Sequence, residues 1–449
     1  MPGATFWLQN LWIRRLTIVL FIGTIVLELY QLTWWRGQPT NLISPVVWLL
    51  SGSLTAVLGW MLAVHAARHG LEINNAVQSN GKVIFKWLLF LVGLVIGIKI
   101  LHSLYQEIPE INNFSDILPA KREYIRRFLS GEIVYRPIPF EYYNLEPTFL
   151  PFRWLPFVVA QVAGFDYRWI SFGALAIGLA VWNARPYVGK NIYLEIIVKC
   201  LLPFYCLQSF VRTDNIALAA AVELLIAGYY LIFTRYFFNK NPFVVALVLT
   251  ICLLSRYSVI LWLPLLFLVL WKEYDLKYIL RVGAYTLLGV FLIYFLPFCL
   301  HDYGKHFFAA AQYYLNASFG TWTPEVWLPE GSLPLHHSRG VGFSLWFILK
   351  APGELRHRFD LMLQVAFLFQ IALTLFFSIV YWFRVRGNDR YVVFAFLLAS
   401  LKVFMMVFNG FLVAPFSYLF EVSFYLSFPL LFILPITNLW RKLPVLEMT

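Results

Sequence analysis

Residues 85–105 read FKWLLFLVGLVIGIKILHSLY, and a stretch of this kind decides the fold class of the whole chain. A helix that crosses a bilayer needs about 20 mainly apolar residues, because each residue adds about 1.5 Å along the helix axis. The apolar run is unbroken rather than alternating, which excludes a strand of a membrane β-barrel. Similar runs recur along the chain, so the sequence predicts an all-α, polytopic helical membrane protein.

The composition of the 449-residue chain favours the same fold class. Apolar residues make up 61% of it and charged residues 13%, whereas soluble domains have about 45–50% and about 25%. The net charge of +12 indicates basic cytoplasmic loops and contact with anionic membrane lipids rather than nucleic acid. We therefore expect membrane lipids as partners and no nucleic acid. All cysteines lie inside apolar runs and are expected to be buried thiols, namely Cys200, Cys206, Cys252 and Cys299.

The apolar runs predict about twelve membrane-spanning helices. They lie at 14–34, 43–66, 85–105, 167–184, 192–209, 214–235, 242–255, 256–271, 279–299, 360–384, 391–410 and 415–438. With this assignment, most Lys and Arg of the short loops lie on one side, which is the cytoplasmic side by the positive-inside rule. Both termini are then cytoplasmic, and the two long segments 106–166 and 300–359 lie together on the outer side.

The first long segment contains a predicted helix at 115–131. Ser115 can cap its start, Pro119 lies in its first turn, and Gly131 ends it. Its apolar residues share one stripe, whereas most of the remaining surface is basic: Lys121, Arg122, Arg126 and Arg127. This pattern predicts an interfacial helix with its basic side toward lipid phosphates, and the plainer alternative is a solvated charged face. Asp116 then lies at the helix N-terminus, just beyond the third span.

Further along this segment come Tyr135-Arg136-Pro137 and the Pro-rich stretch Thr148-Phe149-Leu150-Pro151. The apolar part at 148–163 is too short and too Pro-rich to span a membrane, so we expect a re-entrant or surface helix that closes on Gly164.

This order of parts, an Asp beyond a span, a helix ending in Gly, Tyr-Arg-Pro, Thr-x-x-Pro and a short helix, resembles the GT-C superfamily of glycosyltransferases. The resemblance covers roughly residues 85–300 and is greatest to the bacterial branch with the aminoarabinose and mannosyl transferases. It implies a GT-C-like core at 85–300 that includes the first outer loop, 106–166. Residues 1–84 are then a two-span N-terminal addition with a cytoplasmic loop, and 301–449 hold the second outer loop and three C-terminal spans.

The resemblance also implies an enzyme of the bacterial inner (plasma) membrane that takes a sugar from a polyprenyl-phosphate donor. The acceptor is a glycan, lipid or protein on the extracytoplasmic face. Many members carry a paired acid, D-x-D or E-x-D, but residue 114 is Phe here. The sequence therefore gives no paired-acid support for a divalent metal, and it assigns no metal ligand and no certain cofactor.

Such a transfer needs a carboxylate to accept the acceptor's proton and cations to stabilise the departing phosphate. Asp116 is the predicted general base. The predicted donor-phosphate ligands are Arg256, Arg212, Lys99 and Arg136. The predicted sugar or acceptor ligands are Tyr135, Tyr142, Tyr143, Glu141, Asp214, His336, His337 and Arg339.

Plainer interpretations exist for several of these residues. Arg212 could simply pair with Asp214, Arg256 could extend to lipid headgroups, and His336 and His337 could be ordinary loop residues. A zinc site at His301 and His306 is disfavoured, because residues i and i+5 do not share one face of a helix.

Charged residues inside the predicted spans are costly and must be paired or hydrated. Glu195 and Lys199 are expected to pair at i, i+4, and Glu28 is expected to pair with an outer base such as Arg36. The remaining ones are expected to face the bundle interior or a hydrated cavity: Lys99, Glu223, Lys402 and Glu421.

Two other function classes stay open at the level of the sequence. One is a lipid-linked glycan flippase or polymerase, and the other is a membrane transporter. Neither needs an essential acid beyond the third span, so an Asp116→Asn variant separates both from a transferase.

Overall fold

The computed structural model describes most of the chain. The described residues are 7–34, 42–71, 80–110, 115–140, 143–185, 192–213, 218–219, 223–323, 334, 337, 340–414 and 419–441, without the side chain of residue 213. Apart from one pair of two-residue strands, β1 (Ile138–Pro139) and β2 (Asn144–Leu145), the regular structure in these ranges is helical. The predicted all-α fold class is confirmed for the described residues.

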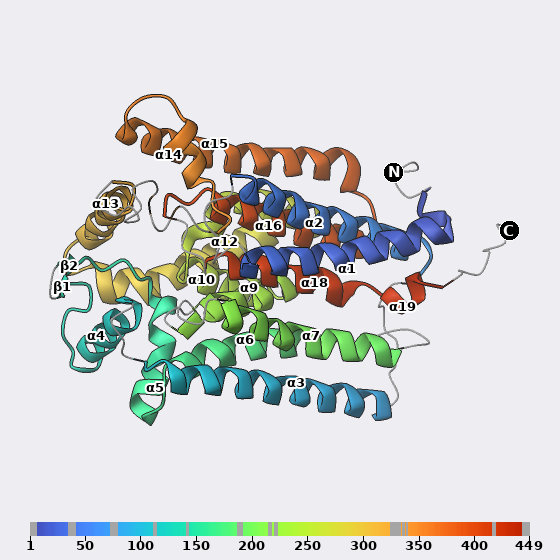
Figure 1. Ribbon diagram of the computed structural model, residues 1–449, viewed down its shortest axis with the longest axis horizontal. Helices are drawn as coiled ribbons and strands as arrows, with labels where there is room; N and C mark the ends of the chain where they lie inside the picture. The colour runs from blue at the N-terminus through green and yellow to red at the C-terminus, as the bar shows by residue number, and fades with distance from the viewer. Residues whose placement is uncertain are drawn as a thin grey trace.

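Seven helices in the described ranges are long and apolar enough to cross a membrane. They are α1 (Leu11–Trp34), α2 (Ser44–Arg68), α3 (Asn80–Glu107), α7 (Ile192–Thr213), α12 (Leu276–Val290) with its continuation η5 (Phe291–Cys299), α15 (Leu355–Val380) with its continuation η7 (Tyr381–Val385), and α16 (Arg390–Gly410). Each overlaps a predicted span, and Figure 1 shows them running lengthwise through the molecule. The chain is therefore a membrane protein with several spans.

The other predicted spans correspond to shorter helices. These are α6 (Arg168–Asn183), α9 (Glu223–Arg235), α10 (Pro242–Leu253), η4 (Tyr257–Trp262) and α11 (Leu263–Glu273). The span predicted at 415–438 is divided into α17 (Phe420–Tyr425), α18 (Ser427–Ile433) and α19 (Ile436–Leu439). Pro435 separates the last two because its ring removes a backbone donor and blocks helix continuation. The total of twelve spans stays a prediction.

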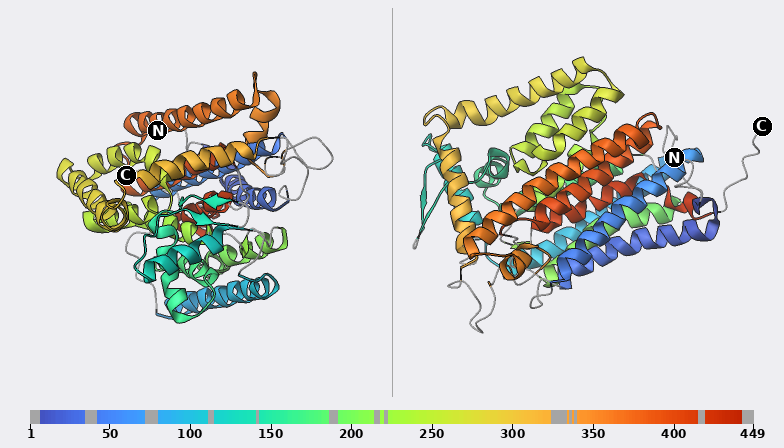
Figure 2. Two further views of the ribbon diagram at one scale, coloured as in Figure 1. Left: turned by 90° about the vertical axis from the view of Figure 1, so that its left-hand side faces the viewer. Right: turned by 90° about the horizontal axis from the view of Figure 1, so that it is seen from above.

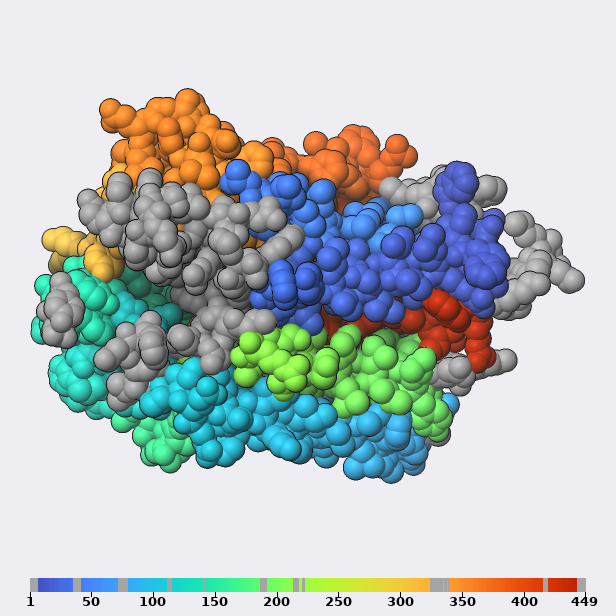
Figure 3. Space-filling model, viewed as in Figure 1, coloured from blue at the N-terminus to red at the C-terminus, as the bar shows by residue number. Residues whose placement is uncertain are grey.

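Close packing between short helices depends on glycine. Gly228 of α9 contacts the backbone of α6, and a Cβ atom at this position would lie 2.3 Å from the carbonyl oxygen of Ala174. Small residues let helix backbones approach in this way in membrane proteins. Helix α3 lies at the edge of the bundle (Figure 3). Many of its exposed side chains are apolar, as in a lipid-facing helix.

The described parts of the two long segments gather at one end of the bundle, which we call the loop end (Figures 1 and 2). They comprise α4 (Ile117–Leu129), η2 (Pro151–Arg153), η3 (Leu155–Phe157), α5 (Val158–Ala163), α13 (Lys305–Gly320) and α14 (Ser344–Lys350). The start of α1 and helix α19 meet at the opposite end, where the Arg14 Nε donates to the Leu439 carbonyl oxygen at 2.6 Å. The predicted arrangement, with both long segments on one face, agrees with this geometry.

Buried ion pairs connect the helices, and one of them differs from the prediction. The Lys402 ammonium of α16 donates to both carboxylate oxygens of Glu28 in α1 at 2.9 Å, and both side chains are fully buried. Glu28 is thus paired across the bundle with Lys402, and Arg36, the partner named in the prediction, lies outside the described residues. The expected pair of Glu195 and Lys199 is confirmed at 3.0 Å. The Glu28–Lys402 pair joins the N-terminal helices to the rest of the bundle.

Candidate functional site

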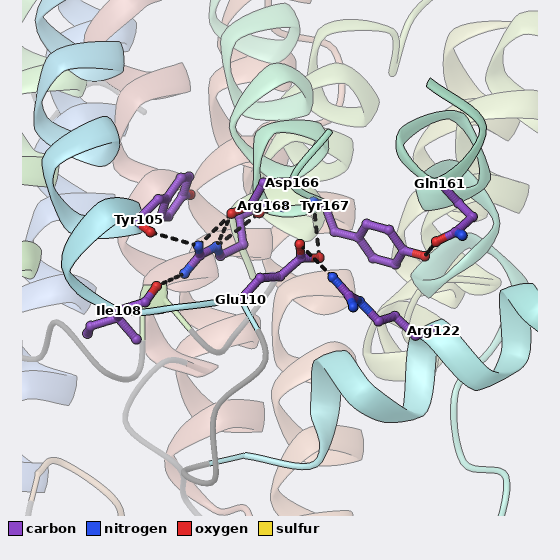
Figure 4. Close-up of polar contacts among 8 residues, drawn as sticks. All are labelled: Tyr105, Ile108, Glu110, Arg122, Gln161, Asp166, Tyr167 and Arg168. Atoms are coloured by element: carbon purple, nitrogen blue, oxygen red, sulfur yellow. Dashed lines mark hydrogen bonds and ion pairs between the residues drawn. The ribbon is translucent and has the colours of Figure 1, made fainter. Parts of the chain in front are cut away.

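A clamp at Arg168 holds the two ends of the first long segment together (Figure 4). Its guanidinium donates to the Asp166 carboxylate from Nε, at 3.0 and 2.9 Å to the two oxygens, and from Nη2 at 2.5 Å. It also donates to the carbonyl oxygens of Ile108 (2.8 Å) and Tyr105 (3.2 Å) at the end of α3. Because Arg168 is itself buried, this clamp fixes where the segment between α3 and α6 leaves and re-enters the bundle.

A second set of contacts attaches α4 to this clamp (Figure 4). The Arg122 guanidinium pairs with the Glu110 carboxylate at 2.9 Å, and the other oxygen of Glu110 accepts the Tyr167 backbone N–H at 3.3 Å. The Tyr167 hydroxyl in turn donates to the Gln161 side-chain oxygen at 2.6 Å. The Arg122 guanidinium therefore has an ion-pair partner within the protein.

Helix α4 has the predicted position but not the predicted surroundings. Ser115 Oγ accepts the Ile117 N–H at 3.2 Å, and Gly131 ends the helix with φ +69°, as expected. The prediction of a basic face directed at lipid phosphates fails for two of its four residues. Lys121 is fully buried, and the Arg127 guanidinium donates to the Arg136 carbonyl oxygen at 2.6 Å. The helix packs on a hydrophobic core that is formed mainly by the same segment and also includes Leu225 of α9 and Phe298 of η5.

The structure brings Asp116 and Tyr143 together, both of which the sequence analysis assigned to the site. The Tyr143 hydroxyl donates to the Asp116 Oδ2 atom at 2.9 Å. Burial, and then the hydrogen bond to Asp116, raise the pKa of Tyr143 above its ordinary value, so the phenol stays protonated and keeps donating. The pKa of Tyr313 in α13 is also raised, first by burial and then by the Asp116 carboxylate. Asp116 thus lies within electrostatic range of a second aromatic hydroxyl, which belongs to the other long segment.

A second group of charged residues surrounds Glu223, and we call Lys121, Arg153, Glu223 and Arg256 the basic cluster. One Glu223 oxygen accepts hydrogen bonds from Arg256 Nη2 at 2.7 Å and from Arg153 Nη2 at 3.2 Å. Burial lowers the pKa of Lys121 well below its ordinary value, and the Arg153 charge lowers it further. Each of the four residues comes from a different part of the chain, and together they place three basic side chains near one carboxylate.

Two hydrogen-bond donors of the basic cluster have no acceptor among the described residues. The Lys121 ammonium faces the rings of Phe149 and Phe157, at 5.4 and 5.0 Å from their centroids. In the part of the chain that the structure describes, it has no hydrogen-bond partner, and neither has Arg256 Nη1. A buried ammonium without an acceptor is costly. An anion that bound here would supply acceptor oxygens and offset the excess of positive charge.

Helix α13 links Asp116 to the basic cluster. Tyr313 feels the Asp116 charge, whereas the neighbouring Tyr314 is affected by the charges of Arg256 and Arg153. Burial is the main cause that raises the pKa of Tyr314. The acid and the two arginines therefore lie within electrostatic range of adjacent residues of one helix, so both groups belong to one region of the loop end.

Several residues predicted for the site have other positions. The Tyr135 ring is buried, and its hydroxyl donates to the Phe149 carbonyl oxygen at 2.9 Å, so it is not open to a sugar. His337 is also buried and lies between the hydroxyls of Thr321 (2.8 Å) and Ser344 (2.7 Å). Both residues hold the loop segments together.

The other predicted phosphate ligands are exposed. Lys99 points away from the bundle interior that it was expected to face, while Arg136 and Arg212 lie at the surface. The expectation of an interior position is therefore wrong for Lys99, whereas it is confirmed for Glu223, Lys402 and Glu421. Five predicted residues lie outside the described residues: Glu141, Tyr142, Asp214, His336 and Arg339.

The site residues predicted from the sequence do not include Lys121, Arg153 or Glu223. A signal existed for Glu223, because it is a charge inside a predicted span without a local partner. Arg153 is likewise a lone basic residue in the apolar stretch 148–163. No protein family, curated protein or solved structure matches this chain.

Proposed function

We propose that this protein is a glycosyltransferase that uses a polyprenyl-phosphate-linked sugar as its donor. The transfer takes place at the loop end, on the extracytoplasmic face of the membrane, which is a bacterial inner membrane in this proposal. The observation that carries the proposal is the basic cluster, in which two partly buried arginines pair with the buried Glu223 carboxylate beside the buried Lys121. The resemblance of residues 85–300 to the GT-C superfamily supports the same reaction.

The basic cluster suits a departing lipid phosphate. When the sugar leaves, the phosphate takes the bonding electrons and gains negative charge in a poorly hydrated place. Fixed cations stabilise such charge more strongly there than water-exposed ones do. The open donors on Lys121 and Arg256 can bind phosphate oxygens directly, and charge-assisted hydrogen bonds of this type are about twice as strong as neutral ones.

Asp116 is the general base of this proposal. The acceptor hydroxyl or amine attacks the anomeric carbon, the bond from that carbon to the phosphate oxygen breaks, and Asp116 takes the acceptor's proton. The hydrogen bond from Tyr143 holds one carboxylate oxygen and leaves the other for the acceptor. A positioned base of this kind contributes about 10²–10⁴-fold to a rate.

Arg256 offers a direct test of the phosphate site. Purified protein in lipid nanodiscs is titrated with a polyprenyl monophosphate, and the Arg256→Ala variant is expected to bind it more weakly and to turn over the donor more slowly. Arg256→Lys is expected to recover part of the affinity and part of the turnover, because it keeps the positive charge but loses the bidentate geometry of the guanidinium. Arg356→Ala, which removes an exposed arginine at the loop end, is the matched control.

Unchanged phosphate affinity and turnover in Arg256→Ala contradict the proposed phosphate site. If lipid-phosphate binding depends on Arg256 but no donor releases its sugar, the result favours a flippase or another carrier of lipid-linked sugars.

A further inference from the structure

The turn between η5 and α13 brings together three residues that the glycosyltransferase proposal does not use: His301, Asp302 and His306. The chain reverses direction here because Tyr303 (φ +56°) and Gly304 (φ +74°) both adopt left-handed conformations. As a result the rings of His301 and His306 stack, with centroids 6.0 Å apart and an interplanar angle of 10°. The two histidines do not have to share a helix face, since His301 precedes the helix and folds back onto it.

The three side chains present ligand atoms at distances that suit one small cation. The His306 Nδ1 atom lies 2.9 Å from Asp302 Oδ2, and the His301 Nε2 atom lies 3.9 Å from the same oxygen. One ligand atom from each residue lies within 4.8 Å of the other two. Zinc bonds of about 2.0–2.2 Å in tetrahedral geometry place ligand atoms about 3.3–3.6 Å apart. Small side-chain rotations therefore suffice to place all three around one ion.

Neighbouring groups already orient two of these ligands. The two oxygens of Asp302 accept the backbone N–H groups of Gly304 at 2.9 Å and His306 at 3.0 Å. The other nitrogen of His306, Nε2, lies 3.1 Å from the Tyr294 hydroxyl. A metal-binding histidine usually has its second nitrogen held in this way, and a binding carboxylate is usually hydrogen-bonded as well.

The short contact between His306 Nδ1 and Asp302 Oδ2 requires a proton or a metal ion between the two atoms. If Nε2 donates its proton to the Tyr294 hydroxyl, the lone pair of Nδ1 points at a carboxylate oxygen 2.9 Å away. Two lone pairs at this distance repel each other unless a proton or a metal ion lies between them. The proton alternative is a simple histidine–aspartate hydrogen bond, and the metal alternative uses the third ligand, His301, as well.

We propose that His301, Asp302 and His306 bind a divalent transition-metal ion of the zinc class at the loop end. Two imidazoles and one carboxylate form the ligand set of many three-residue zinc sites, which keep a fourth position for water or substrate. The same set suits Co²⁺ and Ni²⁺, whereas Mg²⁺ and Ca²⁺ prefer oxygen ligands throughout. The site is independent of the proposed sugar transfer.

A metal ion here would attach the start of α13 to the end of η5. The ring of Tyr135, from the first long segment, stacks on His306 with centroids 4.6 Å apart, so the ion would also tighten the contact between the two long segments. Because α13 carries Tyr313 and Tyr314 toward Asp116 and the basic cluster, metal binding is expected to stabilise that region.

Metal binding by the full-length protein tests this proposal without any activity measurement. The protein is purified through a histidine-free tag, stripped with a chelator and titrated in nanodiscs with Zn²⁺ alone, in competition with a chromophoric chelator. One Zn²⁺ per chain is expected, and Co²⁺ is expected to give the visible absorption of a four-coordinate site. His301→Ala, Asp302→Asn and His306→Ala are each expected to abolish this binding. Tyr294→Phe, which removes only the contact to Nε2, is expected to weaken it about 10–100-fold.

His357→Ala is the matched control, because His357 is an exposed histidine of the second long segment and its removal should leave the affinity unchanged. The proposal is overturned if the wild-type protein binds no Zn²⁺ under these conditions, or if the His301→Ala variant binds it as tightly as wild type. His301 is partly exposed, so its removal is the variant least disruptive to folding. The Co²⁺ spectrum of the wild-type protein gives a second readout that needs no mutation. A spectrum like that of six-coordinate aqueous Co²⁺ contradicts the site.

Discussion

The buried position of Lys121 could not be predicted from the spacing of basic residues in α4. Lys121 is one of four basic residues on α4, and by spacing alone it belongs to a face that solvent or lipid headgroups could cover. In the structure its ammonium is fully buried beside Arg153, Glu223 and Arg256. Periodicity tells which residues share a helix face, but it does not tell what that face packs against.

Anion binding at the basic cluster is expected to depend on pH through Lys121. Burial lowers the pKa of this ammonium in the free protein, and a bound anion favours the protonated form and so raises that pKa. Affinity for a lipid phosphate should therefore be highest below the free-state pKa and fall as the pH rises through it. The measurement is the polyprenyl-phosphate dissociation constant as a function of pH.

The Lys121→Met variant should remove one charge-assisted hydrogen bond, which is worth about 1.5–3 kcal/mol, and should flatten this pH dependence. Arg126→Met is the control, because Arg126 lies on the same helix but is paired with Glu123 and Glu132 at the surface. An equal loss of affinity in both variants would point to a general effect of net charge and count against the buried site.

At the scale of elements, the sequence was most informative where the signal is local. The ends of α4 follow from Ser115 and Gly131, and the short helix α5 ends at Gly164 (φ +72°) as expected. Pairings between distant elements were not predictable in this way. Glu28 and Lys402 are far apart in the sequence, and no periodic pattern connects a charge in α1 with a charge in α16.

The Glu28–Lys402 pair is expected to hold α1 and α16 together, and a double-mutant cycle can measure its contribution. Lys402→Met leaves the Glu28 carboxylate buried without its partner, which typically costs about 3–5 kcal/mol. Adding Glu28→Gln removes the uncompensated charge and should recover a large part of the loss. The readout is reversible unfolding in detergent, with the exposed Lys277→Met as control. Additive losses in the double variant would mean that the two side chains do not interact.

At the scale of the whole molecule, composition alone predicted a helical membrane protein, and the basic residues of the short loops placed the two long segments on one face. The described parts of both segments do lie at one end of the bundle (Figure 1). The number of spans is harder to predict, because helices such as α6 and α17 are short and buried among other helices. Hydropathy measures the length of an apolar run, not whether lipid or protein surrounds it.

The sidedness of this arrangement can be measured by cysteine labelling in intact cells. In a background without the four native cysteines, Ser130→Cys and Phe308→Cys introduce exposed thiols on the two long segments, and Lys277→Cys introduces one at the opposite end. A membrane-impermeant reagent is expected to label the first two from outside and to leave the third unmodified. Labelling of only one of the two long segments would contradict a shared outer face.

Asp116→Asn tests the central proposal most directly, because the amide keeps the size of the side chain and its contact with Tyr143 but cannot accept the acceptor's proton. The purified protein in nanodiscs is given a panel of polyprenyl-phosphate-linked sugars with membrane extract as the acceptor source, and release of polyprenyl phosphate is followed. Wild type and the control Glu132→Gln, an exposed acid beyond the end of α4, are expected to turn over at least one donor at equal rates. Asp116→Asn is expected to lose about 10²–10⁴-fold in turnover while its affinity for the donor is retained. Wild-type turnover in the Asn variant, or no release from any donor by the wild-type protein, would contradict the proposed glycosyl transfer.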